Sequence, residues 1–375
     1  MDNSADRVII AGDDYPVHQT SHPIAYLSTT DSNFYDRYFF NGYSREGSVF
    51  FALALGVYPN LNIMDAAFSV IYEGKQYILR ASRVLGDDPM NMQVGPLTLK
   101  ILEPLKRIHL EITPNGYGIH GDLTFQARGP VLEEPHFFRR EGRKVFFDYT
   151  RMTQHGCWSG RLSIETETFQ LDPQFWWGSR DRSWGIRPVG KQVSSGTPQL
   201  QPQFFWLWSP LHFEDCCTHF DVNEEEDGTC WHKTGMLIRL KDQNIDVMDQ
   251  VKHTIEYQSG TRYAKKANLE FISAQGKHYH IAINPLYNFY MMGLGYLHPT
   301  WGHGMYVGDN VTSGEVLQLA EVDQTAPMYL HIQAVCQASL ETEGNPRQEG
   351  MGIFEMLVIG SHQPSGFKEF LDFAP

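Results

Sequence analysis

The 375-residue sequence lacks any apolar run of about 18 residues, the length that a membrane-spanning helix requires. The longest apolar stretch, residues 49–57, ends at Tyr58 and Pro59. The opening residues, MDNSADRVII, are acidic and lack the basic and then apolar pattern of a secretory signal. We therefore expect a cytoplasmic protein that does not insert into membranes.

Basic runs are also absent. The chain has 30 Lys and Arg against 44 Asp and Glu, a net charge of −14, so neither nucleic acid nor an anionic membrane surface is an expected partner. Its five cysteines include no C-x-x-C motif, and an odd number without regular spacing argues against a disulfide framework. We expect reduced thiols, most of them buried.

Several motifs of enzyme chemistry are missing as well. There is no strand-to-helix G-x-G-x-x-G, no phosphate-binding loop and no H-E-x-x-H, and the sixteen histidines lack the compact spacing of a metal site. We therefore expect no cofactor and no metal. No G-x-S-x-G nucleophile elbow occurs either, which argues against acyl hydrolysis.

The sequence does contain many short runs of β-branched and aromatic residues, separated by Gly, Pro, Asn and Asp. Glu73 and Gly74 are expected to form the turn of a β-hairpin. Residues 202–228 loosely repeat the pattern of residues 48–74. These features predict an all-β protein of two antiparallel barrels, one in residues 1–190 and one in 191–375, with a linker at 187–202.

One stretch at the end of the first half, FWWGSRDRSWGIRP (175–188), combines tryptophans with charged residues. Burial beside indole rings would raise the pKa of Asp181 and allow it to act as a general acid. Arg180 or Arg187 could hold a substrate carboxylate, phenolate or enolate. The alternative is structural, because Arg180 or Arg182 could neutralise Asp181 in a buried ion pair.

Other candidates come from the aromatic strands. Alternation places Trp206 and Trp208 on one face of a strand, where they line a cavity or join the two barrels. Asp65, isolated among apolar residues, is interpreted as a satisfied turn or strand-end group rather than a catalyst, although it could pair with one of the arginines. The remaining residues expected to contact a substrate are Tyr38, Asn41, His155, Trp158, Trp177, Trp184 and His212.

Three stretches carry a resemblance to a known family: DRYFFNGYSREGSVFFALALGVYPNLNIMDAAF, GSRDRSWGIRP and GIFEMLVIGSHQPSGF. The chain resembles the lipocalin-like superfamily of carotenoid 1,2-hydratases (hydroxyneurosporene synthases) and the related two-domain Diels–Alderases, and within it an uncharacterised bacterial branch. The resemblance implies two lipocalin-like barrels side by side, with a hydrophobic substrate cavity near their junction. It also implies that Asp181, in the D-x-x-W-G pattern, faces that cavity.

These observations predict a cofactor-independent lyase, hydratase or isomerase acting on a hydrophobic terpenoid, polyketide or aromatic molecule. The alternative is a carrier that binds such a molecule without changing it. Charged residues clustered beside indoles favour the enzyme, because burying ionisable groups costs several kcal/mol each and gives a carrier little. The expected partner is a hydrophobic small molecule. The chain could also pair with a second copy of itself as a homodimer.

Overall fold

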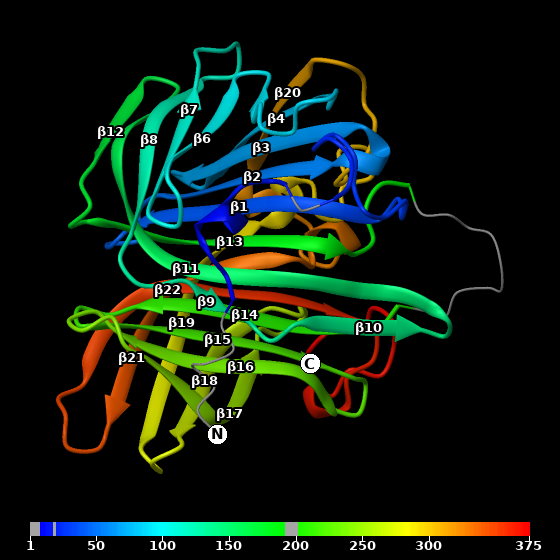
Figure 1. Ribbon diagram of the computed structural model, residues 1–375. Coiled ribbons are helices and arrows are strands. Elements are labelled where there is room, and N and C mark those ends of the chain that lie inside the picture. Colours follow the sequence, from blue (N-terminus) through cyan, green and yellow to red (C-terminus); the bar gives the residue numbers. More distant parts are fainter. Residues whose placement is uncertain (1–7, 18–19, 192–201) are drawn as a thin grey trace. The chain divides into compact units, whose positions relative to one another are not determined.

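β-strands joined by tight turns make up most of the regular structure of the computed structural model, which describes residues 8–17, 20–191 and 202–375 (Figure 1). The predicted all-β class is confirmed. Among the described residues, no helix is long and apolar enough to cross a membrane. The chain forms two compact units, and the expected linker falls mostly on residues 192–201, outside the described residues.

The first unit is built on an open, curled sheet. Across the described residues its strand order is β20-β4-β3-β2-β1-β13-β11-β8-β7-β6-β5, with β9, β10 and β12 also paired to β11. The strands are β1 (Phe34–Ser44), β2 (Phe50–Tyr58), β3 (Ile63–Tyr72), β4 (Lys75–Val84), β5 (Gln93–Val94), β6 (Leu97–Glu103), β7 (Arg107–Ile112), β8 (Ile119–Ala127), β9 (Leu132–Glu133), β10 (Phe137–Glu141), β11 (Lys144–Ile164), β12 (Glu167–Leu171), β13 (Trp176–Ile186) and β20 (Val311–Gln318).

The prediction of a closed barrel for the first half is therefore wrong, because this sheet is open. The sheet has two ends, β20 and β5, which are not paired with each other in the part of the chain that the structure describes. A barrel closes only when its edge strands pair along their length, and β5 is two residues long. The curled sheet corresponds to a half-barrel.

The second unit contains the predicted closed barrel. Its eight described strands follow one another around the barrel: β14 (Phe204–His212), β15 (Cys216–Glu224), β16 (Cys230–Arg239), β17 (Ile245–Tyr257), β18 (Ala264–Ser273), β19 (His278–Tyr290), β21 (Ile332–Thr342) and β22 (Gln348–Ile359). Phe205 and Leu207 of β14 join one apolar cluster with residues from the other seven strands, which fills the interior. Alternation along β14 then directs Trp206 and Trp208 out of this barrel.

Local signals in the sequence correspond to local structure. β3 and β4 pair as a hairpin, and its turn residues Glu73 and Gly74 both have positive φ (47° and 72°), as a type I′ turn requires. The two stretches with similar patterns, 48–74 and 202–228, each fold as two neighbouring strands that end in a Gly-containing turn. The hairpin prediction is confirmed.

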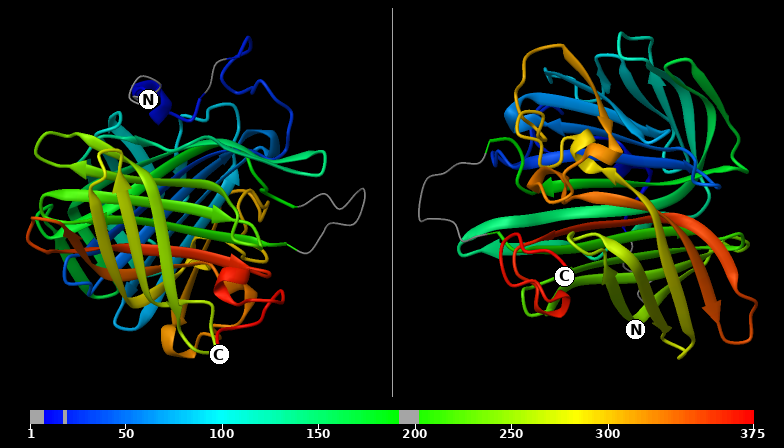
Figure 2. Two further views of the ribbon diagram at one scale, coloured as in Figure 1. Left: turned by 90° about the horizontal axis from the view of Figure 1, so that it is seen from below. Right: turned by 180° about the vertical axis from the view of Figure 1, so that it is seen from behind.

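One segment leaves the second half of the sequence and completes the first unit. Residues Gly293–Leu317 begin within the 3-10 turn η4 (Met291–Leu294), which comes directly after β19, and their strand β20 pairs with β4 (orange in Figure 2, right). The first unit thus comprises the described residues of Met1–Ser44, Phe51–Val193 and Gly293–Leu317. Division of the chain into domains 1–190 and 191–375 stays a prediction.

Candidate active site

The tryptophan- and arginine-rich stretch forms β13, which lies between β1 and β11 (Figure 1). Asp181 is opposite Phe39 of β1 and Thr153 of β11. Because successive side chains of a strand point to opposite faces, Arg180 and Arg182 lie on one face of the sheet and Asp181 on the other. Asp181 is half-buried.

Arg180 and Arg182 are each bound by a carboxylate from another part of the chain. Arg180 Nη1 donates to Asp14 Oδ1 at 2.8 Å and its Nε donates to Gln154 Oε1 at 2.9 Å. Arg182 forms a buried ion pair with Asp36 of β1. Both arginines thus form buried ion pairs, with Asp14 and Asp36 as their carboxylate partners.

Tyr38, Asn41 and Trp158 are fully buried, and their polar atoms bond within the protein. The Tyr38 hydroxyl donates to the Asp14 carbonyl at 2.6 Å, and Trp158 Nε1 donates to the Asn41 carbonyl at 2.8 Å. Asn41 Oδ1 accepts from the backbone N–H of Ser179 at 2.8 Å. A Cβ on Gly178 would lie 2.1 Å from the Asn41 carbonyl, so this close approach of β13 to β1 requires glycine.

Trp177 and Trp184 contact guanidinium groups. The Arg128 guanidinium lies 4.5 Å from the Trp177 ring centre, and that of Arg182 lies 5.1 Å from the Trp184 ring centre. These are cation–π distances, so both indoles stabilise charges within the first unit.

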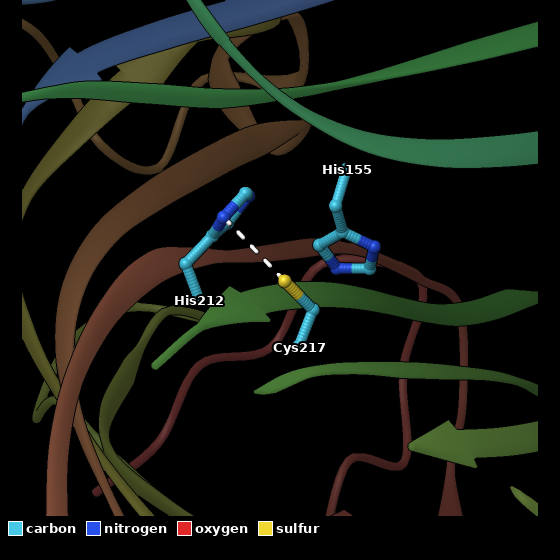
Figure 3. Close-up of side chains that lie close together, drawn as sticks. All are labelled: His155, His212 and Cys217. Carbon is cyan, nitrogen blue, oxygen red and sulfur yellow. Dashed lines mark hydrogen bonds between the residues drawn. The ribbon is translucent and has the colours of Figure 1, made fainter. Parts of the chain in front are cut away.

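The other predicted contact residues lie on different elements. In the second unit, Trp206 Nε1 donates to Asp221 Oδ1 at 2.6 Å, and His212 faces Cys217 across β14 and β15 with Sγ 3.7 Å from Nδ1 (Figure 3). His155 is a buried residue of β11 in the first unit (Figure 3). No single site within one unit contains all the predicted residues.

A different cluster gathers around Asp65 on β3, in the first unit. Asp65 Oδ1 accepts a hydrogen bond from the Tyr58 hydroxyl at 3.3 Å. The Tyr58 oxygen in turn accepts from Arg37 Nη1 at 3.1 Å. Asp65 Oδ2 accepts from the backbone N–H of Gly304 at 2.9 Å. Three neighbouring strands and one distant loop thus fix a single carboxylate.

The loop from residue 293 onward supplies the remaining wall. Arg37 Nη2 lies 3.4 Å from the Leu294 carbonyl, and its guanidinium is 5.0 Å from the centre of the Tyr296 ring. The Tyr296 ring packs edge-on against His303 at 4.2 Å, and His303 Nε2 lies 3.1 Å from the same Leu294 carbonyl. Tyr296 and His303 are both half-buried, so this side of the cluster reaches the surface.

Burial raises the pKa of Asp65 to about 6, against the opposing effects of Arg37, the Gly304 N–H and the Tyr58 hydroxyl. The carboxyl is surrounded by protein, yet the residue keeps some exposed surface. Burial also raises the pKa of Tyr58, so its hydroxyl stays protonated and remains a donor. Asp65 can therefore give or take a proton near neutral pH while the Tyr58 hydroxyl holds its carboxyl in place.

Arg187, a predicted catalytic residue, belongs to this cluster and adds a second cation. Its guanidinium lies 4.3 Å from the centre of the Tyr35 ring, and its charge acts on both Asp65 and Tyr58. Its buried Nη2, and Nε of Arg37, have no hydrogen-bond partner among the described residues. Two guanidinium groups therefore accompany one carboxylate, which leaves donors for an anionic or electron-rich oxygen.

Sequence reasoning found only part of this cluster. Arg187 is a predicted catalytic residue, whereas Asp65 is interpreted from the sequence as a structural group that could pair with an arginine, and Tyr58, Tyr296 and Gly304 are not predicted. Asp65 and Gly304 are 239 residues apart in the sequence. Nothing in the local pattern around Gly304 indicates that its N–H reaches a carboxylate on β3.

A family model described as "Family of unknown function (DUF8625)" matches residues 9–368. The chain belongs to this family. No curated protein matches the sequence of this DUF8625 member.

Solved structures resemble this DUF8625 protein at low sequence identity. An AttH-type protein from Nitrosomonas europaea has a TM-score of 0.52 and 12% identity, with 88% of this chain and 94% of that chain covered. Kievitone hydratase from Nectria haematococca has a TM-score of 0.51 and 10% identity, with 92% and 96% covered. CghA, solved with Sch210972, has a TM-score of 0.52 and 13% identity, with 92% and 97% covered. The resemblance inferred from the sequence is confirmed at the level of the fold.

Proposed function

We propose that this DUF8625 protein is a cofactor-independent lyase, hydratase or isomerase that acts on a hydrophobic small molecule, with Asp65 as its proton-transfer residue. The observation that carries the proposal is the position of Asp65. Its carboxyl is held by Tyr58 and Gly304, has a pKa raised to about 6 by burial, and lies in the field of Arg37 and Arg187. A general acid or base works best when its pKa lies near the working pH.

The surrounding donors suit a substrate whose reacting carbon is conjugated to an oxygen. In the hydration of such a double bond, water adds to the β-carbon and negative charge develops on the carbonyl oxygen. The unpartnered Nη2 of Arg187 would stabilise that enolate, while the ionised Asp65 would take a proton from the attacking water and then deliver it to the α-carbon. The reverse sequence gives dehydration, and protonation at another carbon of the enolate gives isomerisation.

Aromatic and apolar side chains give this cluster an apolar surround. Tyr35, Tyr58, Ile63 and Val189 form a buried cluster against which Tyr149 packs. In such surroundings a charge–charge or charge–dipole interaction is worth more than in water. A substrate with an apolar body and one electron-rich oxygen is the class that this arrangement fits.

The solved relatives support a small-molecule substrate. One is a hydratase by name, and another was solved with the small molecule Sch210972. The alternative function is that of a carrier that encloses its ligand in a barrel. The structure supports it less, because buried apolar side chains from all eight strands pack together inside the closed barrel of the second unit. Asp181, on β13, stays a second candidate for proton transfer.

The test begins with kievitone, Sch210972 and a metabolite extract of the producing cell as probes, followed by mass analysis of free and bound molecules. Gain or loss of one water, or a rearranged product of unchanged mass with a new retention time, supports the enzyme. Recovery of a bound molecule that is never converted supports the carrier and contradicts the proposal.

Three variants then locate the reacting carboxyl. We expect Asp65→Asn to lower the rate by about 10²–10⁴-fold while binding persists, because the titrating group is lost and the shape is kept. Asp122→Asn, at an exposed position beside His109, serves as the matched control and should keep full activity. A large loss in Asp181→Asn with full activity in Asp65→Asn would move the site to the other candidate.

A further inference from the structure

A second group of reactive side chains lies in the second unit, outside the Asp65 cluster. The Ser365 hydroxyl is 2.7 Å from His362 Nδ1, and His362 Nε2 is 3.0 Å from Glu224 Oε2. Tyr257 approaches from another side, with its hydroxyl 2.6 Å from Ser365 Oγ. Serine, histidine and carboxylate therefore form one continuous line of hydrogen bonds.

The partners determine where the protons lie. An ionised Glu224 can only accept, so the Nε2 atom of His362 carries hydrogen and its Nδ1 is left with a lone pair. That lone pair accepts the Ser365 hydroxyl hydrogen, and the Tyr257 hydroxyl donates to Ser365 Oγ. This is the order of roles in which a base removes the proton of a serine nucleophile and a carboxylate orients the base. The two imidazole nitrogens have exchanged places relative to the usual triad.

The base is held rigidly. The His362 ring is 1% exposed on its side chain and stacks on Phe205 with 3.9 Å between ring centres. The backbone N–H of Gln363 donates to the Glu226 carbonyl at 2.8 Å, which ties the 3-10 turn η7 (Gln363–Ser365) to the turn after Glu224. The turn that carries the serine and the strand that carries the carboxylate are thus joined directly.

Arg262 anchors the rest of the C-terminal segment. Its guanidinium is buried, and Nη1 donates to the Gly360 carbonyl at 2.8 Å while Nη2 donates to Asp372 Oδ1 at 2.8 Å. The same group lies 4.4 Å from the Phe367 ring centre. Residues on both sides of His362 are therefore fixed to the barrel, which keeps the hydrogen-bonded line in one geometry.

A turn alone does not account for this arrangement. Ser365 and His362 are three residues apart, so their contact is local. Glu224 is 138 residues from His362, however, and Tyr257 is 108 residues from Ser365. A turn needs neither of these distant groups. Ser365 is half-buried between the exposed Pro364 and Gly366, so an electrophile can reach its hydroxyl.

We propose that Ser365 is an activated nucleophile that accepts an acyl or phosphonyl group from an activated donor. In the step with an ester, Ser365 Oγ forms a bond to the carbonyl carbon and the bond from that carbon to the leaving oxygen breaks. The serine proton passes to His362 Nδ1 and then to the leaving alkoxide. The product is an ester on Ser365 and a free alcohol.

Transfer stops at the acylated serine. The backbone N–H groups of Ser365, Gly366 and Phe367 already donate to carbonyl oxygens of the same turn, at 3.2, 3.0 and 3.1 Å. None of the three is directed at the oxygen of a tetrahedral intermediate, and loss of one such donor typically costs about 10²–10³-fold in rate. Reagents with a very good leaving group should react once, and the resulting ester should persist.

The experiment uses the full chain and a fluorophosphonate, which forms a bond from serine oxygen to phosphorus as the bond from phosphorus to fluorine breaks. We expect one adduct per chain, located on Ser365 by mass spectrometry of the digested protein. Glu224→Gln, which keeps the size of the side chain, should slow labelling by about 10²-fold or more because His362 loses its carboxylate. Ser365→Ala should abolish the adduct.

Controls separate activation from mere exposure. Ser163 hydrogen-bonds a threonine instead of a histidine, so Ser163→Ala should label as fast as the unaltered chain. Circular dichroism establishes that each variant is folded, and His362→Gln, which removes the base, replaces Glu224→Gln if the latter does not fold, with slower labelling again expected. No adduct on Ser365, or labelling equally fast in the folded variant, would overturn the proposal.

Discussion

Replacing Asp65 with asparagine should stabilise the protein above pH 6 while it lowers activity. Burial raises the pKa of Asp65 in the folded chain from an ordinary value of 3.8 to about 6. The folded state therefore holds this proton more tightly than the unfolded state does. The favourable contribution is fully present below pH 3.8 and is lost as the pH rises through about 6, so an ionised Asp65 weakens the fold at neutral pH.

The size of the effect follows from this pKa. One pKa unit corresponds to about 1.36 kcal/mol, so ionising Asp65 costs up to about 3 kcal/mol above pH 6. Asparagine avoids this cost, but its side chain has one acceptor oxygen for two donors, the Tyr58 hydroxyl and the Gly304 N–H. Losing one hydrogen bond costs about 1 kcal/mol. We expect a net gain of about 2 kcal/mol at pH 8.

Urea denaturation of the original chain and of Asp65→Asn, at several pH values from 4 to 8, measures this difference. All other titrating groups are common to the two proteins, so the pH dependence of the difference belongs to Asp65. The gain should be absent near pH 4, where the variant should be slightly less stable. A difference that stays constant across the range, or falls as the pH rises, would refute the reasoning about this carboxyl.

Three further predictions concern other buried groups. Asp14→Asn should cost about 3–5 kcal/mol in urea denaturation because it leaves the Arg180 guanidinium buried without its anion, and a loss below about 1 kcal/mol would contradict this. Tyr58→Phe removes a hydroxyl that lowers the pKa of Asp65, so that pKa, followed by NMR of the carboxyl carbon, should rise above about 6 and should not fall. Burial raises the pKa of the Cys336 thiol, so Ellman's reagent should modify Cys336 only after unfolding, whereas the exposed Cys230 should react in the native protein; modification of native Cys336, located by mass spectrometry, would count against this.

The local part of the fold could be read from the sequence because it depends on neighbouring residues. Alternating apolar residues and the Glu73-Gly74 turn specify strands and a hairpin without reference to the rest of the chain. Whether a sheet closes depends instead on which strands become edges. The pairing of β4 with β20, which follows β19 in the sequence, had no local signal, and the open sheet was missed for that reason.

The candidate site shows the same limit. The grouping of Arg180, Asp181 and Arg182 suggested that neighbours in sequence would pair, yet alternation along β13 separates them onto two faces. Asp14, 166 residues from Arg180, supplies the carboxylate instead. Sequence reasoning identified chemically suitable residues such as Arg187, but their partners depend on contacts between distant strands.

The return of residues Gly293–Leu317 to the first unit links the synthesis of one half of the protein to the completion of the other. A ribosome must translate six strands of the closed barrel before the segment bearing Tyr296 and Gly304 emerges. A fragment that ends near residue 190 would lack the β20 edge strand and one of the two donors to Asp65. Neither half can therefore be exchanged on its own. Recombination of one half alone would separate Asp65 from the loop that carries Gly304.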